Sequence, residues 1–166
     1  MVPSNGVNLD KLKELILILA RHKSVSNLGV TKLAKLVYYI DAEAMRVLGD
    51  SVTQSEFIKH ENGPVPSRMD RALKQLSKAE SIRVVKEEFF AHQLKKVEAM
   101  RDADMRPFRQ EELEIVDRIA KKLGQVSAAE LSSLSHKEPA WREAEYLAKL
   151  DPELIPYGTE EDPDEL

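Results

Sequence analysis

The chain has 166 residues, of which 42% are apolar and 33% are charged, a composition typical of a globular domain and not of a disordered or collagen-like chain. It contains no cysteine, which excludes disulfides, thiolate metal sites and a cysteine nucleophile and favours a reducing compartment, so we expect a cytoplasmic protein. The longest mostly apolar run, residues 15–20, is far shorter than the roughly 20 residues that a membrane-spanning helix needs, and no charged and then apolar leader opens the chain. We therefore expect neither export nor a membrane partner.

Charge is distributed unevenly along the chain. Seven acidic and no basic residues follow position 150, whereas residues 1–150 have a formal charge of +3. A short acidic, proline-containing segment buries too little apolar surface to offset its ordering entropy, so residues 151–166 are predicted to form a disordered tail. Residues 1–8, rich in Pro, Ser, Asn and Gly, are predicted to be flexible, which leaves residues 9–150 as a single domain.

Two helices are predicted in the first 50 residues. The first covers residues 9–22 after Asn8, a good N-cap, and its apolar residues surround it almost completely. The second is capped by Thr31 and ends at Gly49, a plausible left-handed terminator. Its apolar stripe at helical spacing consists of Leu33, Leu36, Val37, Ile40, Ala44 and Leu48.

The pattern changes between residues 50 and 100. A short strand around residues 52–58 precedes His60-Glu61-Asn62-Gly63-Pro64-Val65-Pro66, which we interpret as a rigid turn because two prolines and a glycine disfavour a helix or a central strand. Ser67 and Asp70 resemble a capping box that starts a third helix, ending near Lys78. Residues 82–85 and 94–97 then predict a β-hairpin, although a helix over residues 87–100 is an alternative.

The last third is predicted to be helical. A fourth helix ends at Gly124, Ser127 and Glu130 form the capping box of a short fifth helix, and Pro139 opens a sixth that continues to Leu150. The fold class is therefore α+β and predominantly helical, with about six helices, a short strand and a β-hairpin packed on one side.

The sequence offers no positive evidence for catalysis. The four histidines, His22, His60, His92 and His136, are far apart and lack the i, i+4 spacing of a metal site, and no nucleophile turn or phosphate-binding glycine loop occurs. We therefore predict no catalytic residue, no metal and no cofactor. The enzyme alternative depends on His60 beside Glu61, or His136 beside Glu138, as a proton-transfer group.

One charged helix face suggests a different function. Arg68, Arg71, Lys74 and Lys78 share a stripe of the third helix, and a helix followed by a hairpin resembles the recognition helix and wing of a winged helix-turn-helix protein. A DNA-binding transcriptional regulator that uses residues 68–78 is the alternative function. A pI of about 5.7 and 5% aromatic residues count against it, so we do not expect a nucleic-acid partner.

Three stretches together resemble the Panacea domain of the SocA-like antitoxin family. They are KLAKLVYYID at residues 32–41, KHENGPVP at residues 59–66, and AAELSSLSH followed by PAW at residues 128–141. The resemblance covers roughly residues 9–150; the stretch 104–109 carries no landmark, and the acidic end lies outside the shared pattern. It implies a bacterial or phage-associated, non-enzymatic antitoxin that neutralises a cognate protein toxin by direct binding. In the namesake, the family member is an adaptor that delivers the toxin to a Clp-type protease.

The candidate partner-binding residues come from these landmarks and from the basic helix face. Gly63 and the two prolines make the turn stiff, so that little ordering entropy would be lost on binding, although the turn could equally serve only to aim the third helix. His136 and Trp141 are predicted to form a corner in which the indole covers the core and the imidazole bonds a helix end. Self-association is left open. The predicted site residues are Tyr38, Tyr39, His60, Gly63, Pro64, Pro66, Arg68 and Arg71.

Overall fold

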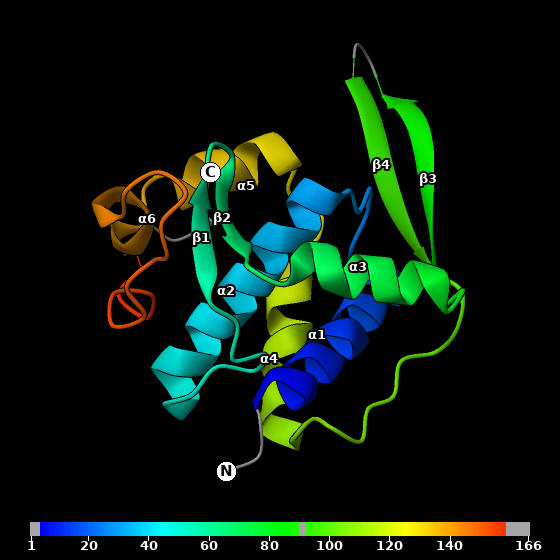
Figure 1. Cartoon of the computed structure of the whole chain (residues 1–166), viewed down its shortest axis with the longest axis horizontal. Helices are drawn as coiled ribbons and strands as arrows, with labels where there is room; N and C mark the ends of the chain where they lie inside the picture. Colours follow the sequence, from blue (N-terminus) through cyan, green and yellow to red (C-terminus); the bar gives the residue numbers. More distant parts are fainter. Residues whose placement is uncertain (1–3, 90–91, 159–166) are drawn as a thin grey trace.

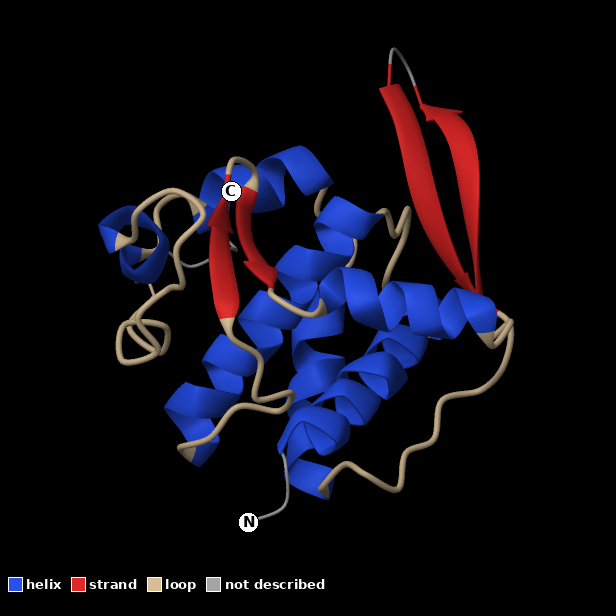
Figure 2. Ribbon diagram, viewed as in Figure 1, coloured by secondary structure: helices blue, strands red, loops and turns tan. Residues whose placement is uncertain are grey.

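Six helices and four short strands make up the computed structural model, which describes residues 4–89 and 92–158 (Figures 1 and 2). This confirms the predicted α+β, predominantly helical fold class. In chain order the elements are α1 Ser4–Arg21, α2 Val30–Leu48, β1 Phe57–His60, β2 Gly63–Pro66, α3 Met69–Lys78, β3 Ile82–Phe89, β4 His92–Ala99, α4 Gln110–Leu123, α5 Ala128–Ser135 and α6 Pro139–Glu143.

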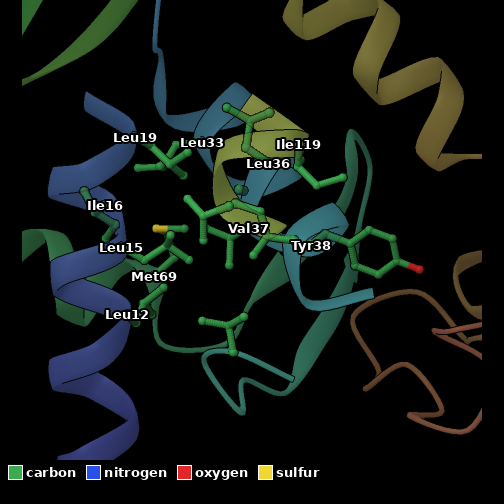
Figure 3. Close-up of a cluster of buried hydrophobic side chains, with 14 of the residues drawn as sticks. Leu12, Leu15, Ile16, Leu19, Leu33, Leu36, Val37, Tyr38, Met69 and Ile119 are labelled. Carbon is green, nitrogen blue, oxygen red and sulfur yellow. The ribbon is translucent and has the colours of Figure 1, made fainter. Parts of the chain in front are cut away.

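Helix α2 is the centre of the core. It packs against α1, α4, α5 and the β1–β2 hairpin, so its predicted apolar stripe is covered from several sides (Figure 1). Figure 3 shows the side chains of Leu36 and Val37 enclosed between α1 and Ile119 of α4. Leu15, Ile16, Leu36 and Val37 are all 0% exposed, so this cluster accounts for much of the hydrophobic stabilisation.

Both ends of α2 are formed by glycines. Gly49 adopts the left-handed conformation (φ +79°) that was predicted for the helix terminator. The predicted N-cap, Thr31, is wrong, because α2 begins at Val30 with Gly29 as N-cap and without a side-chain capping bond. Gly29 also pairs with Lys96 of β4, and this pairing fixes where the chain enters the helix.

The boundaries of the first and last helices differ from the prediction. Helix α1 begins at Ser4, within the stretch expected to be flexible, whereas residues 1–3 lie outside the described residues. Helix α6 ends at Glu143 and not at Leu150, because residues 147–150 pair with β1: Leu147 N–H donates to Lys59 O (2.9 Å). Residues 151–158, the first part of the expected tail, form turns that bury Ile155, whereas residues 159–166 lie outside the described part.

The predicted capping boxes have opposite outcomes. Ser127 caps α5, because its side chain accepts the Glu130 amide, as predicted. Ser67 does not cap α3, whose N-cap is Arg68 without a side-chain capping bond. The Ser67 amide instead donates to Glu56 O (2.8 Å), so this residue still belongs to the base of the preceding hairpin.

The segment predicted as a rigid turn is a strand, and with β1 it forms an antiparallel hairpin. The sheet tolerates Pro64 and Pro66 because they lie opposite Lys59 and Phe57, whose backbone groups bond to residues 147–150 on the other edge of β1. The missing proline amides would therefore point away from β1, and no ladder bond is lost.

The second predicted hairpin is confirmed, and the alternative helix over residues 87–100 is wrong. Strands β3 and β4 pair in register from Ile82–Ala99 to Phe89–His92. The hairpin follows α3 directly and projects from the body of the protein (Figure 2). Its base is fixed to the core, where Ile82 and Val97 are buried and Val97 N–H donates to Leu28 O (2.8 Å).

Candidate protein-binding site

The turn of the β1–β2 hairpin is held by two aromatic side chains, one from the C-cap residue of α5 and one from α6. Trp141 Nε1 donates to His60 O (3.1 Å), and His136 Nε2 donates to Glu61 O (2.9 Å). The two rings stack with their centroids 4.2 Å apart, and the ammonium of Lys59 lies 4.1 Å from the centre of the indole. The predicted corner therefore exists, but its imidazole bonds the hairpin turn and not a helix end.

A pocket of about 390 Å³ opens beside this hairpin; we call it the hairpin pocket. Its walls come from the first turns of α2, from the hairpin face that carries Ile58 and Val65, and from the start of α3. His60 and Tyr146 stand at its rim, and the ring of Tyr146 is mostly exposed. Polar and apolar side chains contribute about equally to the lining of the pocket.

Lys35 of α2 lies beneath the hairpin, with 0% of its surface exposed, and lines the pocket. Its Nζ donates to Pro64 O (3.1 Å), and burial lowers the pKa of this ammonium from 10.5 to about 8. Gly63 makes this fit possible, since a Cβ at this position would lie 2.4 Å from Lys35 Cε and 2.3 Å from Ser135 Oγ. Its φ of +117° is also one that other residues rarely adopt.

A buried carboxylate positions the chain that leads into β1. Asp41 of α2 accepts hydrogen bonds from the amides of Val52 and Thr53, both at 3.0 Å. Complete burial raises the pKa of Asp41 from 3.8 to about 6, because desolvation outweighs these hydrogen bonds. The hydrogen bonds of this carboxyl thus fix the α2–β1 connection, although burial of the ionised form costs desolvation free energy.

The structure brings together six of the eight predicted site residues. His60 and Pro66 line the hairpin pocket, Gly63 and Pro64 complete strand β2 beside it, and Arg68 and Arg71 lie at the start of α3. Their grouping is an observation about geometry; their role in binding stays a prediction.

The two tyrosines lie elsewhere. Tyr38 is 0% exposed and packs edge-on against Phe57 (centroids 5.2 Å apart), and its hydroxyl has no hydrogen-bond partner among the described residues. Burial raises the pKa of Tyr38 and Tyr39 far above the usual value. Tyr39 lines a separate pocket of about 110 Å³ between α2, α4 and the segment that contains Ile155. Neither tyrosine reaches the hairpin pocket.

Sequence reasoning missed Lys35 and Tyr146. The sequence did not predict that Lys35 is buried, because the apolar stripe of α2 predicts that only one face of the helix is covered. In the structure the β1–β2 hairpin and α5 cover further faces of α2. Tyr146 was assigned to a helix that in fact ends at Glu143. Leu147, which follows it, has a φ of +65°, a conformation that no sequence pattern signalled.

Among residues 4–89 and 92–158, no group of three or more His, Asp or Glu side chains could hold a metal ion. No helix in the same described ranges is long and apolar enough to cross a bilayer.

The architecture thus defines a small, helix-rich α+β protein in which a clamped hairpin and a pocket form the most distinctive surface. Comparison with family models gives the class a name. The model of the antitoxin SocA-like, Panacea domain matches residues 33–142, about two thirds of the chain, and the chain belongs to this family. A search of the curated proteins and a search of the solved structures each find no match.

Proposed function

We propose that this protein is an antitoxin that neutralises a cognate protein toxin by direct contact, and that the hairpin pocket and its rim form the contact surface. Family membership carries the antitoxin role. The turn of the β1–β2 hairpin supports this location of the contact surface, because hydrogen bonds from Trp141 and His136 already fix the turn in the protein alone. A pre-organised surface loses little conformational entropy on binding.

The rim offers an anchor for a protein partner. Tyr146 and Leu147 are neighbouring apolar side chains that are 63% and 56% exposed, and Tyr146 borders the pocket. Exposed aromatic residues beside a pocket are frequent binding hot spots. The positive φ of Leu147 adds to this argument, because strained backbone is concentrated at functional sites.

The test is co-expression with the product of the neighbouring reading frame. We expect that product to be harmful alone and harmless with the wild-type protein. Tyr146→Ala should lose the protection, whereas the matched control Tyr157→Ala, which removes a similarly exposed tyrosine that does not line the hairpin pocket, should keep it. A neighbouring product that is harmless alone and does not co-purify would contradict the antitoxin role.

Delivery of the toxin to a Clp-type protease in the cytoplasm is the finer form of this proposal. Occlusion and delivery differ in what happens to the toxin. If the protein is an adaptor, the toxin should be degraded by purified protease only when this protein is present. A stable toxin that is nevertheless inhibited would indicate occlusion alone.

The geometry does not favour the DNA-binding alternative. Arg71, Lys74 and Lys78 are exposed on α3, and the β3–β4 hairpin follows α3 as a wing would. However, residues 49–68, which include the whole β1–β2 hairpin, separate α2 from α3, where a helix-turn-helix has a turn of three or four residues.

A further inference from the structure

The projecting hairpin has one closed edge and one open edge. The outer edge of β4 is closed near its base, because Lys96 pairs with Gly29 and Val97 N–H donates to Leu28 O (2.8 Å). In the part of the chain that the structure describes, β4 is the strand neighbour of β3 and nothing pairs with the other edge of β3. Figure 1 shows β3 on the side of the hairpin away from α2. An unpaired strand edge is a template for another strand.

The hydrogen bonds of the hairpin show which backbone groups of β3 point outward. Met100 N–H donates to Ser81 O (2.8 Å), so these two residues form a hydrogen-bonded pair at the base of the ladder. Such pairs alternate along an antiparallel ladder, so the odd-numbered residues of β3 bond to β4. The N–H and C=O groups of Val84 and Lys86 therefore point away from β4, toward the open edge.

The order of charges along β3 suits a second copy of the same strand. A two-fold axis between two copies makes their β3 strands antiparallel neighbours. Because only even-numbered residues can bond outward, the permitted registers differ by two residues. In one of them, Val84 pairs with Lys86 of the second copy, and Arg83 lies opposite Glu87 of the second copy. The symmetry forms each of these pairs twice, with opposite charges facing each other.

The other registers lack this complementarity. A shift by two residues in one direction places Lys86 opposite Lys86 of the second copy, and a shift by four places Glu87 opposite Glu87. Like charges directly opposite each other are destabilising. A shift by two in the other direction places Arg83 opposite Val85, so that no ion pair forms across the edge. The charges thus select one register of the strand with itself.

We propose that this protein forms a homodimer through the open edge of β3, in which two β3–β4 hairpins join into one antiparallel sheet. Main-chain hydrogen bonds link Val84 of each copy to Lys86 of the other. The two Val85 side chains lie opposite each other at the axis, between the two ion pairs of Arg83 with Glu87. The dimer does not use the hairpin pocket, so it adds to the proposed function and does not depend on it.

The side chains at this edge are accessible. Val84 is 39% exposed, Glu87 is exposed, and the side chain of Arg83 is 63% exposed. Arg83 Nη2 donates to Glu98 Oε2 of its own β4 (2.7 Å). A guanidinium has five N–H donors, so Arg83 can bind this carboxylate and that of Glu87 of the second copy together.

The experiment measures self-association of the purified full chain by analytical ultracentrifugation. An interface between two strand edges is small, so we expect a reversible monomer–dimer equilibrium with a dissociation constant on the order of 100 µM. The measurement therefore extends to a protein concentration of about 1 mM. A wild-type protein that remains monomeric at this concentration would overturn the proposal.

Two charge reversals test the register. Arg83→Glu and Glu87→Arg each turn both ion pairs into like-charge pairs, so each variant alone should dimerise at least about 10-fold more weakly than the wild type. A mixture of the two variants restores opposite charges at both positions and should form a heterodimer. Dimerisation of the single variants as strong as that of the wild type, or a mixture that stays monomeric, would overturn the proposed register and with it the proposal.

A matched pair of variants controls for net charge. Lys74→Glu and Glu114→Arg change exposed side chains outside β3 by the same amounts of charge. Each should dimerise like the wild type, and mixing them should produce no additional dimer. If these variants behave like those of β3, the association is a general effect of charge, and the proposal is wrong.

Hydrogen exchange of the wild type, measured by NMR, locates the contact without any variant. The outward amides of Val84 and Lys86 should exchange several-fold more slowly at high than at low protein concentration. The amide of Val85, which bonds to β4, should be protected at both concentrations. A dimer in which the amides of Val84 and Lys86 exchange equally fast at both concentrations would place the contact elsewhere and refute the proposal.

Discussion

The two hairpins of this protein have similar topology and opposite surroundings. In β1–β2, Gly63, Pro64 and Pro66 are buried, and the side chains of His136, which caps α5, and Trp141 of α6 bond its turn. The β3–β4 hairpin is attached at its base and projects from the body (Figure 1), and Val84, which pairs with the buried Val97, is already 39% exposed. The more tightly packed hairpin is thus the one beside the pocket, so substitutions in the two hairpins should have very different effects on stability.

Filling the space under the β1–β2 turn should cause the greatest loss of stability. Gly63→Ala places a Cβ against Lys35 and Ser135 in a backbone conformation that alanine rarely adopts, and should destabilise the protein by about 3 kcal/mol. Gly49→Ala is the matched control. Gly49 also has a positive φ, but nothing lies within 4 Å of the added Cβ, so about 1 kcal/mol is expected. Equal losses in urea unfolding would show that the hairpin is not tightly packed.

The next largest effect is a pH dependence of the free energy of unfolding, which comes from Asp41, the carboxyl that fixes the connection leading into β1. Because the pKa of Asp41 is about 6 in the folded protein and 3.8 for an unperturbed aspartate, the folded state retains a proton that the unfolded chain releases between these pH values. The stabilisation by this proton is present below pH 4 and is lost as the pH rises through 6. Its size is on the order of 3 kcal/mol.

Asp41→Asn preserves the shape and removes the titration. We therefore expect the wild type to lose stability relative to this variant between pH 4 and pH 6, as measured by unfolding at several pH values. Parallel stability curves for the two proteins over this range would show that Asp41 does not titrate there.

A smaller loss of stability is expected from removing one of the two hydrogen bonds that hold the β1–β2 turn. Trp141→Phe removes the hydrogen bond to His60 O and should cost about 1 to 2 kcal/mol. Val84→Thr on the projecting hairpin should change stability by less than about 0.5 kcal/mol. A loss from Val84→Thr as large as that from Trp141→Phe would remove the contrast between the hairpins.

The smallest effect on stability is expected from the basic face of α3. The double variant Arg71→Glu, Lys74→Glu changes exposed side chains and should alter the free energy of unfolding by less than about 0.5 kcal/mol. It should also leave retention on a DNA column unchanged. Salt-sensitive retention of the wild type that this variant abolishes would revive the DNA-binding alternative.

Local sequence signals predicted much of the fold. The apolar period of α2, Gly49 as its end, Ser127 as the cap of α5, and the β3–β4 pairing are each determined within a few residues, and the structure contains all of them. The failures share a physical cause. Helix α6 ends early because residues 147–150 pair with β1, a strand about 90 positions earlier, and the prolines of β2 fit because of that same pairing.

The candidate site was predictable only in part, for the same reason. The landmark residues His60 to Pro66 were predicted to be a rigid binding turn, because glycine and proline restrict the backbone locally, and they form the turn and the second strand of the β1–β2 hairpin. Lys35 and Tyr146 join the pocket through contacts between α2, the hairpin and the segment after α6, and no local pattern encodes such contacts.

The most direct test of the account is the affinity of the purified protein for the product of the neighbouring reading frame, measured by calorimetry. We predict tight binding by the wild type and by Tyr157→Ala, and a loss of at least about 10-fold for Tyr146→Ala at the rim of the hairpin pocket. Undiminished binding by Tyr146→Ala would contradict the assignment of the contact surface, and the absence of binding by the wild type would contradict direct neutralisation.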